Sequence, residues 1–140
     1  MKRCIFHDTE QIRRERKLFE IVERSYSRRE KVLVYAGSGT RADELDRILW
    51  ILKQEAFIPH KICRMHEQDP DVPVAIVTEE FNPIEAETLI ADGHCSIEFA
   101  SGFDSVHEFV NRVSPEMQRE CRSRYRAYLD RKAPVKYLKE

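Results

Sequence analysis

Apolar residues in this chain gather in short, nearly continuous runs separated by longer amphipathic segments. Residues 31–36 read Lys-Val-Leu-Val-Tyr-Ala and residues 73–78 read Pro-Val-Ala-Ile-Val-Thr. Uninterrupted β-branched runs of this kind are typical of strands buried on both faces of a parallel sheet. Shorter apolar runs at residues 3–7 and 95–100 predict two further strands.

Between these runs, apolar residues recur at helical spacing behind recognisable start signals. Two pairs of residues have the spacing of a helix N-cap pair, namely Asp8 with Gln11 and Ser105 with Glu108. The dipeptide Asn82-Pro83 would place a proline in the first turn of a helix. The predicted helices begin at Asp8 (to about Tyr26, with Ile12, Phe19, Val22 and Tyr26 on its apolar face), at Arg41 after a Thr40 cap (to about Gln54), at Asn82 (to about Asp92), at Ser105 and at Ser114-Pro115.

Strands and helices that alternate in this order predict one doubly wound α/β domain over residues 1–140, with a mostly parallel central sheet flanked by helices. Hydrophobic residues make up 41% of the 140 residues and charged residues 35%, as in a globular domain. The formal net charge of −1 gives the whole chain no basic footprint of the kind that a dedicated DNA-binding protein carries.

The last predicted helix departs from this charge balance. At about 100° per residue, its outer arc would carry guanidinium groups beside an aromatic ring, with Arg124 set apart near the core-facing side. That arc holds Arg119, Arg122, Tyr125, Arg126 and Leu129, while Met117, Cys121 and Tyr128 form the stripe that would face a core. Such a surface suits a carboxylate-rich peptide or a phosphate backbone, and a merely solvated arginine-rich face fits the pattern equally well.

A second unusual feature is Trp50. The apolar stripe of its predicted helix is formed by other residues (Ala42, Leu45, Ile48, Leu49 and Leu52), and Trp50 lies about 130° from the centre of that stripe. An aromatic ring on a polar face is either covered by a following loop or used for a partner. Phe57 could extend the same patch, so we favour the partner interpretation.

Other motifs give weaker signals. Residues 37–40, Gly-Ser-Gly-Thr, lie between a strand and a helix, where a phosphate could dock, but they lack both the third glycine and the lysine of nucleotide-binding loops. His60-x-x-Cys63-x-x-His66 matches no standard zinc spacing. His94-Cys95 resembles a thiol-imidazole pair without a source of thiolate activation. We therefore expect no catalytic residues, no metal and no cofactor.

The sequence also indicates a cellular compartment. The four cysteines show no paired spacing, as expected of reduced thiols. The opening residues do not form a signal peptide, and no apolar run approaches the ~18 residues of a membrane span. We expect a cytoplasmic protein.

Several residue blocks together resemble one known family. The specific ones are Leu49-Trp50 followed by Phe57-Ile-Pro-His60, and the terminal Arg124-Tyr-Arg-Ala-Tyr128; Lys31-Val-Leu-Val and Pro73-Val-Ala-Ile support them. Over nearly its whole length, the chain resembles the chi subunits of bacterial DNA polymerase III holoenzyme. In this sequence Gln118 stands where the family often has a lysine, with Arg119 beside it as a candidate substitute, and residues 79–94 do not align with the family pattern.

The resemblance implies a Rossmann-like fold without nucleotide chemistry and a non-catalytic role in replication. It implies that Arg122, Tyr125 and Arg126, with Arg119 beside them, bind the acidic C-terminal tail of single-stranded DNA-binding protein. It assigns Trp50 and Phe57 to the contact with the psi subunit, which links chi to the clamp loader, so that DNA is reached only indirectly. The alternative left open is a small nucleotide-binding enzyme that uses Gly37–Thr40.

Overall fold

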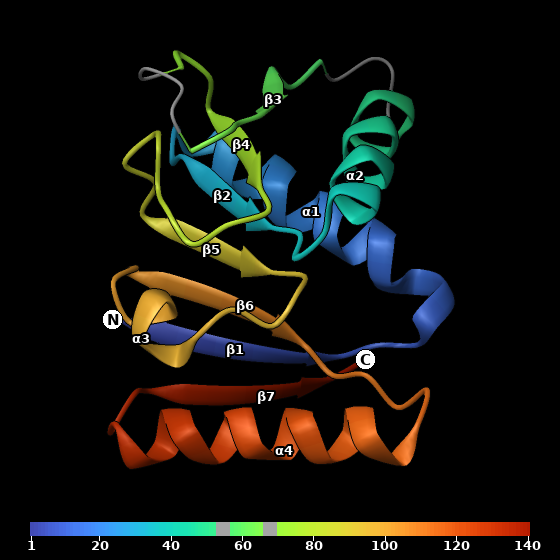
Figure 1. Cartoon of the computed structure of the whole chain (residues 1–140), viewed down its shortest axis with the longest axis vertical. Coiled ribbons are helices and arrows are strands. Elements are labelled where there is room, and N and C mark those ends of the chain that lie inside the picture. The colour runs from blue at the N-terminus through green and yellow to red at the C-terminus, as the bar shows by residue number, and fades with distance from the viewer. Residues whose placement is uncertain (53–56, 66–69) are drawn as a thin grey trace.

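The computed structural model describes residues 1–52, 57–65 and 70–140, and it contains a single seven-stranded sheet (Figure 1). All neighbouring strands run parallel, in the order β3-β4-β2-β5-β6-β1-β7. The strands are β1 (Arg3–Asp8), β2 (Val32–Tyr35), β3 (His60–Ile62), β4 (Val74–Val77), β5 (Thr88–Ala91), β6 (Ser105–Phe109) and β7 (Val135–Lys139). The predicted α/β class with a mostly parallel sheet is therefore confirmed.

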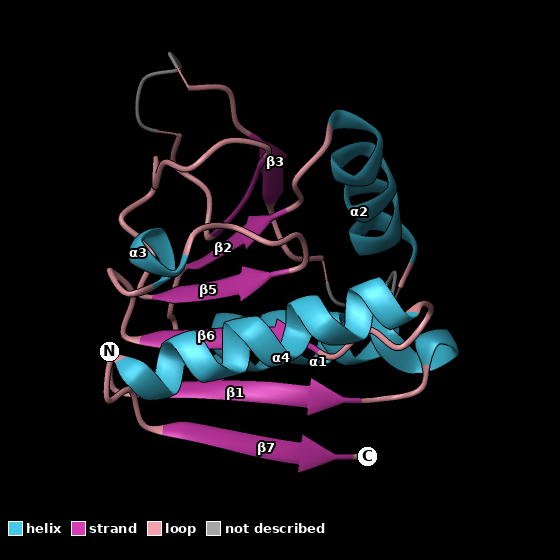
Figure 2. Cartoon of the chain, turned by 60° about the horizontal axis from the view of Figure 1, so that its bottom comes forward, coloured by secondary structure: helices cyan, strands magenta, loops and turns pink. Residues whose placement is uncertain are grey.

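Helices cover both faces of the sheet (Figure 2). They are a 3-10 turn η1 (Gln11–Arg13), α1 (Arg14–Ser27), α2 (Gly39–Ile51), α3 (Ile97–Ala100) and α4 (Pro115–Asp130). Buried side chains of α1 and α2, such as Leu18 and Leu45, pack with Val34 on one face. Tyr128 of α4 packs with Val106 on the other face. No helix in the described ranges is long and apolar enough to cross a membrane.

The strands at residues 3–7, 31–36 and 73–78 and the start of the last helix are confirmed, while the first two helix starts are shifted. Asp8 belongs to β1 and does not cap a helix. The 3-10 turn η1 precedes α1, and Ile12, which was predicted on the apolar face of the helix, is 87% exposed. The second helix is capped by the side chain of Ser38, which accepts from Arg41 N, instead of by Thr40. Its described end is Ile51, and the predicted end at Gln54 lies outside the described residues.

The three predictions between residues 82 and 113 are wrong. No helix begins at Asn82. Its side chain stabilises a loop by accepting a hydrogen bond from Ala86 N and donating one to Ala86 O, at 3.0 Å each. Strand β5 follows this loop. The predicted strand at residues 95–100 is the short helix α3, capped by Ser96. The predicted helix at Ser105 is β6, in which Glu108 is buried.

The tail after Ala133 forms the edge strand β7. β7 lies beside β1 at one edge of the sheet, held by bonds such as Cys4 N to Pro134 O (3.0 Å) and Glu140 N to Asp8 O (2.9 Å). Because α4 and β7 are adjacent in sequence and pack together, this edge of the sheet and the outer arc of α4 form one surface.

Candidate functional site: a groove beside the last helix

A buried ion pair fixes how α4 faces the sheet. Arg124 is 8% exposed, and its guanidinium donates to both carboxylate oxygens of Glu108 on β6, at 2.9 and 2.6 Å. Tyr128 OH donates to the same carboxylate at 2.6 Å. Burial alone would lower the pKa of Arg124, but the bonds to Glu108 raise it above its ordinary value, so the guanidinium stays charged. The prediction that Arg124 lies on the core side is confirmed.

The outer arc of α4 lines an open groove of about 650 Å³. The other wall comes from β1, β7 and the segment after β6. The lining side chains are Phe6, Val110, Arg112, Gln118, Cys121, Arg122, Tyr125, Arg126, Leu129, Asp130 and Tyr137. Three of the predicted binding residues, Arg122, Tyr125 and Arg126, are therefore brought together in one groove.

The base of the groove is aromatic. The ring of Tyr125 stands edge-on to Phe6, with centroids 5.2 Å apart, and edge-on to Tyr137 at 6.4 Å. Phe6 is 2% exposed and belongs to the core, so Tyr125 rests on a fixed support. Edge-to-face packing of this kind can accept one further ring or aliphatic side chain.

A polar cluster braces the far wall. Arg112 donates to Asp8 at 2.6 Å and to Tyr137 OH at 3.0 Å, and Tyr137 OH donates to the same Asp8 carboxylate. Asp8 is 7% exposed, so its charge is satisfied mainly by these two donors. The cluster holds β7 against the segment after β6 and leaves the Tyr137 ring facing the groove.

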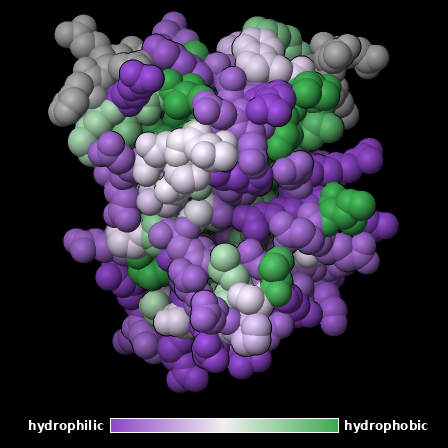
Figure 3. Space-filling model, turned by 45° about the vertical axis from the view of Figure 1, so that its right-hand side comes forward, coloured by the Kyte–Doolittle hydropathy of each residue, from purple (hydrophilic) through white to green (hydrophobic). Residues whose placement is uncertain are grey.

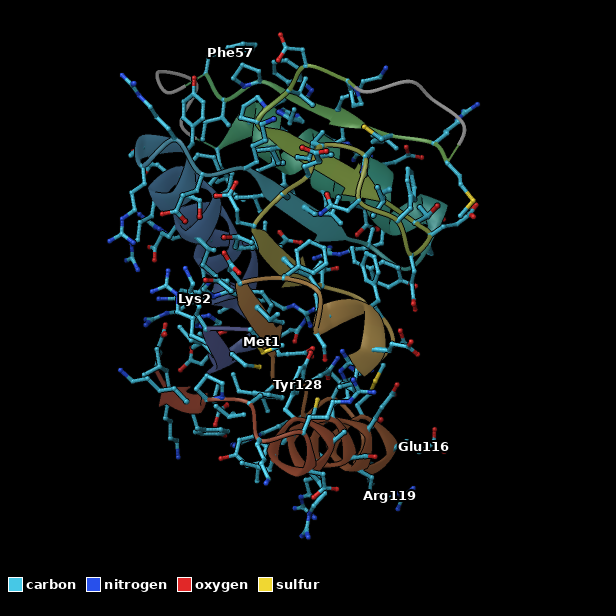
Figure 4. The ribbon with its side chains drawn as sticks, turned by 90° about the vertical axis from the view of Figure 1, so that its left-hand side faces the viewer. Met1, Lys2, Phe57, Glu116, Arg119 and Tyr128 are labelled. Carbon is cyan, nitrogen blue, oxygen red and sulfur yellow. The ribbon has the colours of Figure 1, made fainter. Side chains whose placement is uncertain are left out.

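The groove also carries unpaired positive charge. Arg122 and Arg126 lie one turn apart at its rim, and neither side chain has a hydrogen bond or ion pair with any described residue. Arg119 is exposed but does not line the groove, whereas its neighbour Gln118 does. Figure 4 views α4 nearly end-on, with Tyr128 directed toward the sheet and Arg119 on the solvent side.

An apolar base with two free guanidinium groups at its rim suits an acidic segment that carries an aromatic or aliphatic side chain. Sequence reasoning missed Phe6, Arg112 and Tyr137, because they come from three other segments that only the folded sheet brings to α4. The apolar-polar-apolar alternation of Val135, Lys136 and Tyr137 was a strand signal that could have indicated Tyr137.

A second exposed aromatic pair lies at the other end of the molecule, on α2 and the segment before β3 (Figures 1 and 4). Trp50 is 47% exposed and Phe57 is 61% exposed, with ring centroids 5.2 Å apart. Trp50 also contacts the His60 ring at 4.5 Å. The predicted placement of Trp50 off the apolar stripe is confirmed. In Figure 3 hydrophobic side chains form separate patches on a mostly hydrophilic surface.

In the Gly37–Thr40 loop, Gly37 packs against Gly93, whereas the space beside Gly39 is open. Gly37 has φ +85°, and Gly93 packs so closely that a Cβ there would lie 2.8 Å from Ala36 O. Beside the loop, the Asp92 carboxylate accepts hydrogen bonds from Arg41 at 2.7 Å and from Arg14 at 3.1 Å. The two cations nearest the loop are therefore already paired with a carboxylate of the protein. These contacts favour a plain turn over a phosphate loop.

The side chains of His60 and His94 also contact other residues of the protein. His60 Nδ1 lies 2.8 Å from Ile58 O, and its Nε2 lies 3.2 Å from Asp46. His66 lies outside the described residues, among which no metal-binding cluster occurs. Burial raises the pKa of Cys95 to about 11, so its thiol is protonated at neutral pH. His94 lies 2.6 Å from the Glu120 carboxylate.

Comparison with known proteins gives two matches. The family model described as DNA polymerase III chi subunit, HolC, matches residues 1–136. A curated relative, the DNA polymerase III subunit chi of Pseudomonas aeruginosa, is 27% identical over 115 residues, which cover 82% of this chain and 78% of the relative. The family match spans the Trp50–Phe57 pair, strands β1 to β6 and every residue that lines the groove except Tyr137.

Proposed function

The chain belongs to the DNA polymerase III chi subunit family, and on that premise we propose that its α4 groove captures the acidic C-terminal tail of single-stranded DNA-binding protein. The observation that carries the proposal is the pairing of two unneutralised guanidinium groups with an aromatic base in one open groove. The protein then acts as a non-catalytic replication accessory subunit.

The chemistry of the tail matches the groove in two parts. Arg122 and Arg126 pair with carboxylates of the tail, where charge-assisted hydrogen bonds contribute about 1.5–3 kcal/mol each. The terminal phenylalanine of the tail enters the space between Tyr125, Leu129 and Tyr137. Because the cations are exposed, the affinity is modest and falls as salt rises. Several tails on one single-stranded DNA-binding protein then increase the overall affinity through avidity.

The Trp50–Phe57 pair is proposed as the second contact surface, for a psi-type subunit that connects the chain to the clamp loader. The exposed area of both rings supports a protein partner, since Trp and Phe are enriched in interface cores. The two surfaces lie at opposite ends of the molecule (Figure 1), so both partners can bind at once and the chain can bridge them. DNA is reached at this groove only through the tail.

Calorimetric titration with a tail peptide tests the proposal. Arg126→Gln should weaken binding about ten-fold, the equivalent of one charge-assisted hydrogen bond. Arg119→Gln removes the same charge from the same helix outside the groove and should weaken binding less. Arg16→Gln, on α1, is the control for total charge and should leave the affinity unchanged. Equal losses in all three variants would contradict a groove-specific site.

A further inference from the structure

The opposite face of the sheet holds a small cavity between α1 and strands β1, β6 and β7. Its volume is about 80 Å³, comparable to two or three water molecules at about 30 Å³ each. Its charged lining consists of four cations (Arg3, Lys17, Arg24 and Arg28) against two carboxylates (Glu20 and Glu30). Excess positive charge around a small polar space favours an anion.

Two stacked histidines form the inner wall of this cavity. The rings of His7 and His107 are 5.2 Å apart and nearly parallel, and His7 Nε2 lies 2.9 Å from His107 Nδ1. His7 is only 3% exposed, yet its Nδ1 has no hydrogen-bond partner of good geometry. A buried polar atom left in this state is costly and marks a place where a ligand atom can bind.

The contacts of the two His7 ring nitrogens indicate which of them carries the proton. Its Nδ1 faces the acceptor-only carboxylate of Glu140 at 3.5 Å, too far for a good hydrogen bond. A neutral His7 with its proton on Nδ1 has an acceptor at Nε2, which receives the His107 Nδ1 proton. The pair thereby orients one N–H donor outward.

The cations nearby are only partly neutralised. Lys17 Nζ lies 3.1 Å from Glu140 and 3.9 Å from Glu20. Arg3 donates to the uncharged Ser105 hydroxyl at 2.9 Å. The side chain of Arg24 has no hydrogen bond or ion pair with any residue that the structure describes. Burial first, and then the neighbouring charges of His7, Arg3, Arg24 and Lys17, lower the pKa of His107 to about 3.

We propose that this cavity is a phosphate-binding site, in which His7 Nδ1, Lys17 and Arg24 bind the oxygens of one phosphate group. Glu140, which does not line the cavity, holds its carboxylate against His7 Nδ1 and Lys17, so a phosphate that binds these two groups displaces that carboxylate. Arg3 and Arg24 remain to hold the additional charge of a phosphate. Lys17 and Arg24 lie within about 20° of each other on one face of α1. Arg28, the residue that directly follows α1, adds a third cation to the cavity lining.

A titration with inorganic phosphate, read from the histidine ring signals by NMR, tests the site. Sodium chloride at matched ionic strength controls for screening. We expect saturable shifts of the His7 and His107 signals with phosphate only. Arg24→Gln should weaken phosphate binding about five- to ten-fold, as for one lost charge-assisted bond. Arg16→Gln, exposed on another face of α1, is the matched control and should bind as the wild type does.

A short single-stranded oligonucleotide identifies the source of the phosphate. If the oligonucleotide binds and both Arg24→Gln and Arg28→Gln weaken it, the site takes a backbone phosphodiester; if only inorganic phosphate binds, it takes a small free ion. Arg24 and Arg28 are exposed, so both variants fold. Identical linear shifts with phosphate and chloride, or equal effects of Arg24→Gln and Arg16→Gln, overturn the proposal.

Discussion

Arg122 and Arg124 stand two residues apart on α4 and face opposite ways. Arg122 is exposed at the rim of the groove, whereas Arg124 is 8% exposed and bonded to Glu108 at 2.6 and 2.9 Å. The same residue type therefore has two roles on one helix. Arg124 fixes the rotation of α4, and that rotation is what presents Arg122 and Arg126 to a ligand.

The first prediction concerns this pair. Arg124→Met leaves the Glu108 carboxylate buried without its cation, so we expect the free energy of unfolding to fall by about 3–5 kcal/mol. Arg122→Met should change it by no more than about 0.5 kcal/mol, as is usual for exposed positions. Urea denaturation of both variants measures the difference. Equal stability of the two would contradict the orienting role of Arg124.

The fold could be predicted where local sequence and tertiary structure agree. The apolar runs that became β2 and β4 allow few alternatives, because they are buried on both faces. Ser114 and Pro115 start α4 by local capping, with the Ser114 hydroxyl accepting from Met117 N at 3.2 Å. Elements of this kind need little information from the rest of the chain.

The wrongly predicted elements are those whose secondary structure depends on contacts with residues far away in the sequence. Ser105 and Glu108 have the spacing of a capping box. They nevertheless belong to strand β6, which pairs with β1 and β5. The buried Glu108 carboxylate accepts a hydrogen bond from Arg124, which is sixteen residues later in the sequence. β5 has only four residues, all buried, so its strand state depends on β2 and β6. Helical periodicity located Arg122, Tyr125 and Arg126 correctly, whereas Arg112 and Tyr137 entered the groove through the sheet order.

The second prediction concerns the Trp50–Phe57 pair. Trp50→Ala should leave the protein folded, because half of the ring is exposed, and should abolish capture of a psi subunit in a pull-down. Ile12→Ala removes an apolar side chain that is 87% exposed elsewhere and serves as the control. A Trp50→Ala protein that unfolds would show that the ring is structural.

The third prediction is a loss of stability at alkaline pH. Burial raises the pKa of Cys95 to about 11 and that of Cys4 to about 12, against an ordinary value of 9.0. The folded state thus favours the neutral thiols: their contribution is complete below about pH 9 and is lost as pH rises toward 11. Urea midpoints between pH 7.5 and 10 measure this decline. Cys95→Ala should flatten the profile, and an unchanged profile would count against the buried thiol.

The fourth prediction is a loss of stability in acid. Burial and neighbouring cations lower the pKa of His107 to about 3 from 6.5, so the folded state favours the neutral ring. Its contribution is complete above about pH 6.5 and is lost as pH falls toward 3. His107→Gln should lower the stability at pH 7.5 yet reduce its dependence on pH between 6.5 and 4, as measured by thermal unfolding. A variant with the wild-type slope would exclude His107 as the source.

The most direct test of the tail-binding groove is an amide NMR titration with the tail peptide, with and without its terminal phenylalanine. Binding in the groove predicts saturable shifts at Val110, Tyr125, Leu129 and Tyr137, which line it. It also predicts little change at Trp50 and much weaker binding when the phenylalanine is removed. Shifts centred on Trp50 and Phe57, or equal binding of both peptides, would contradict it.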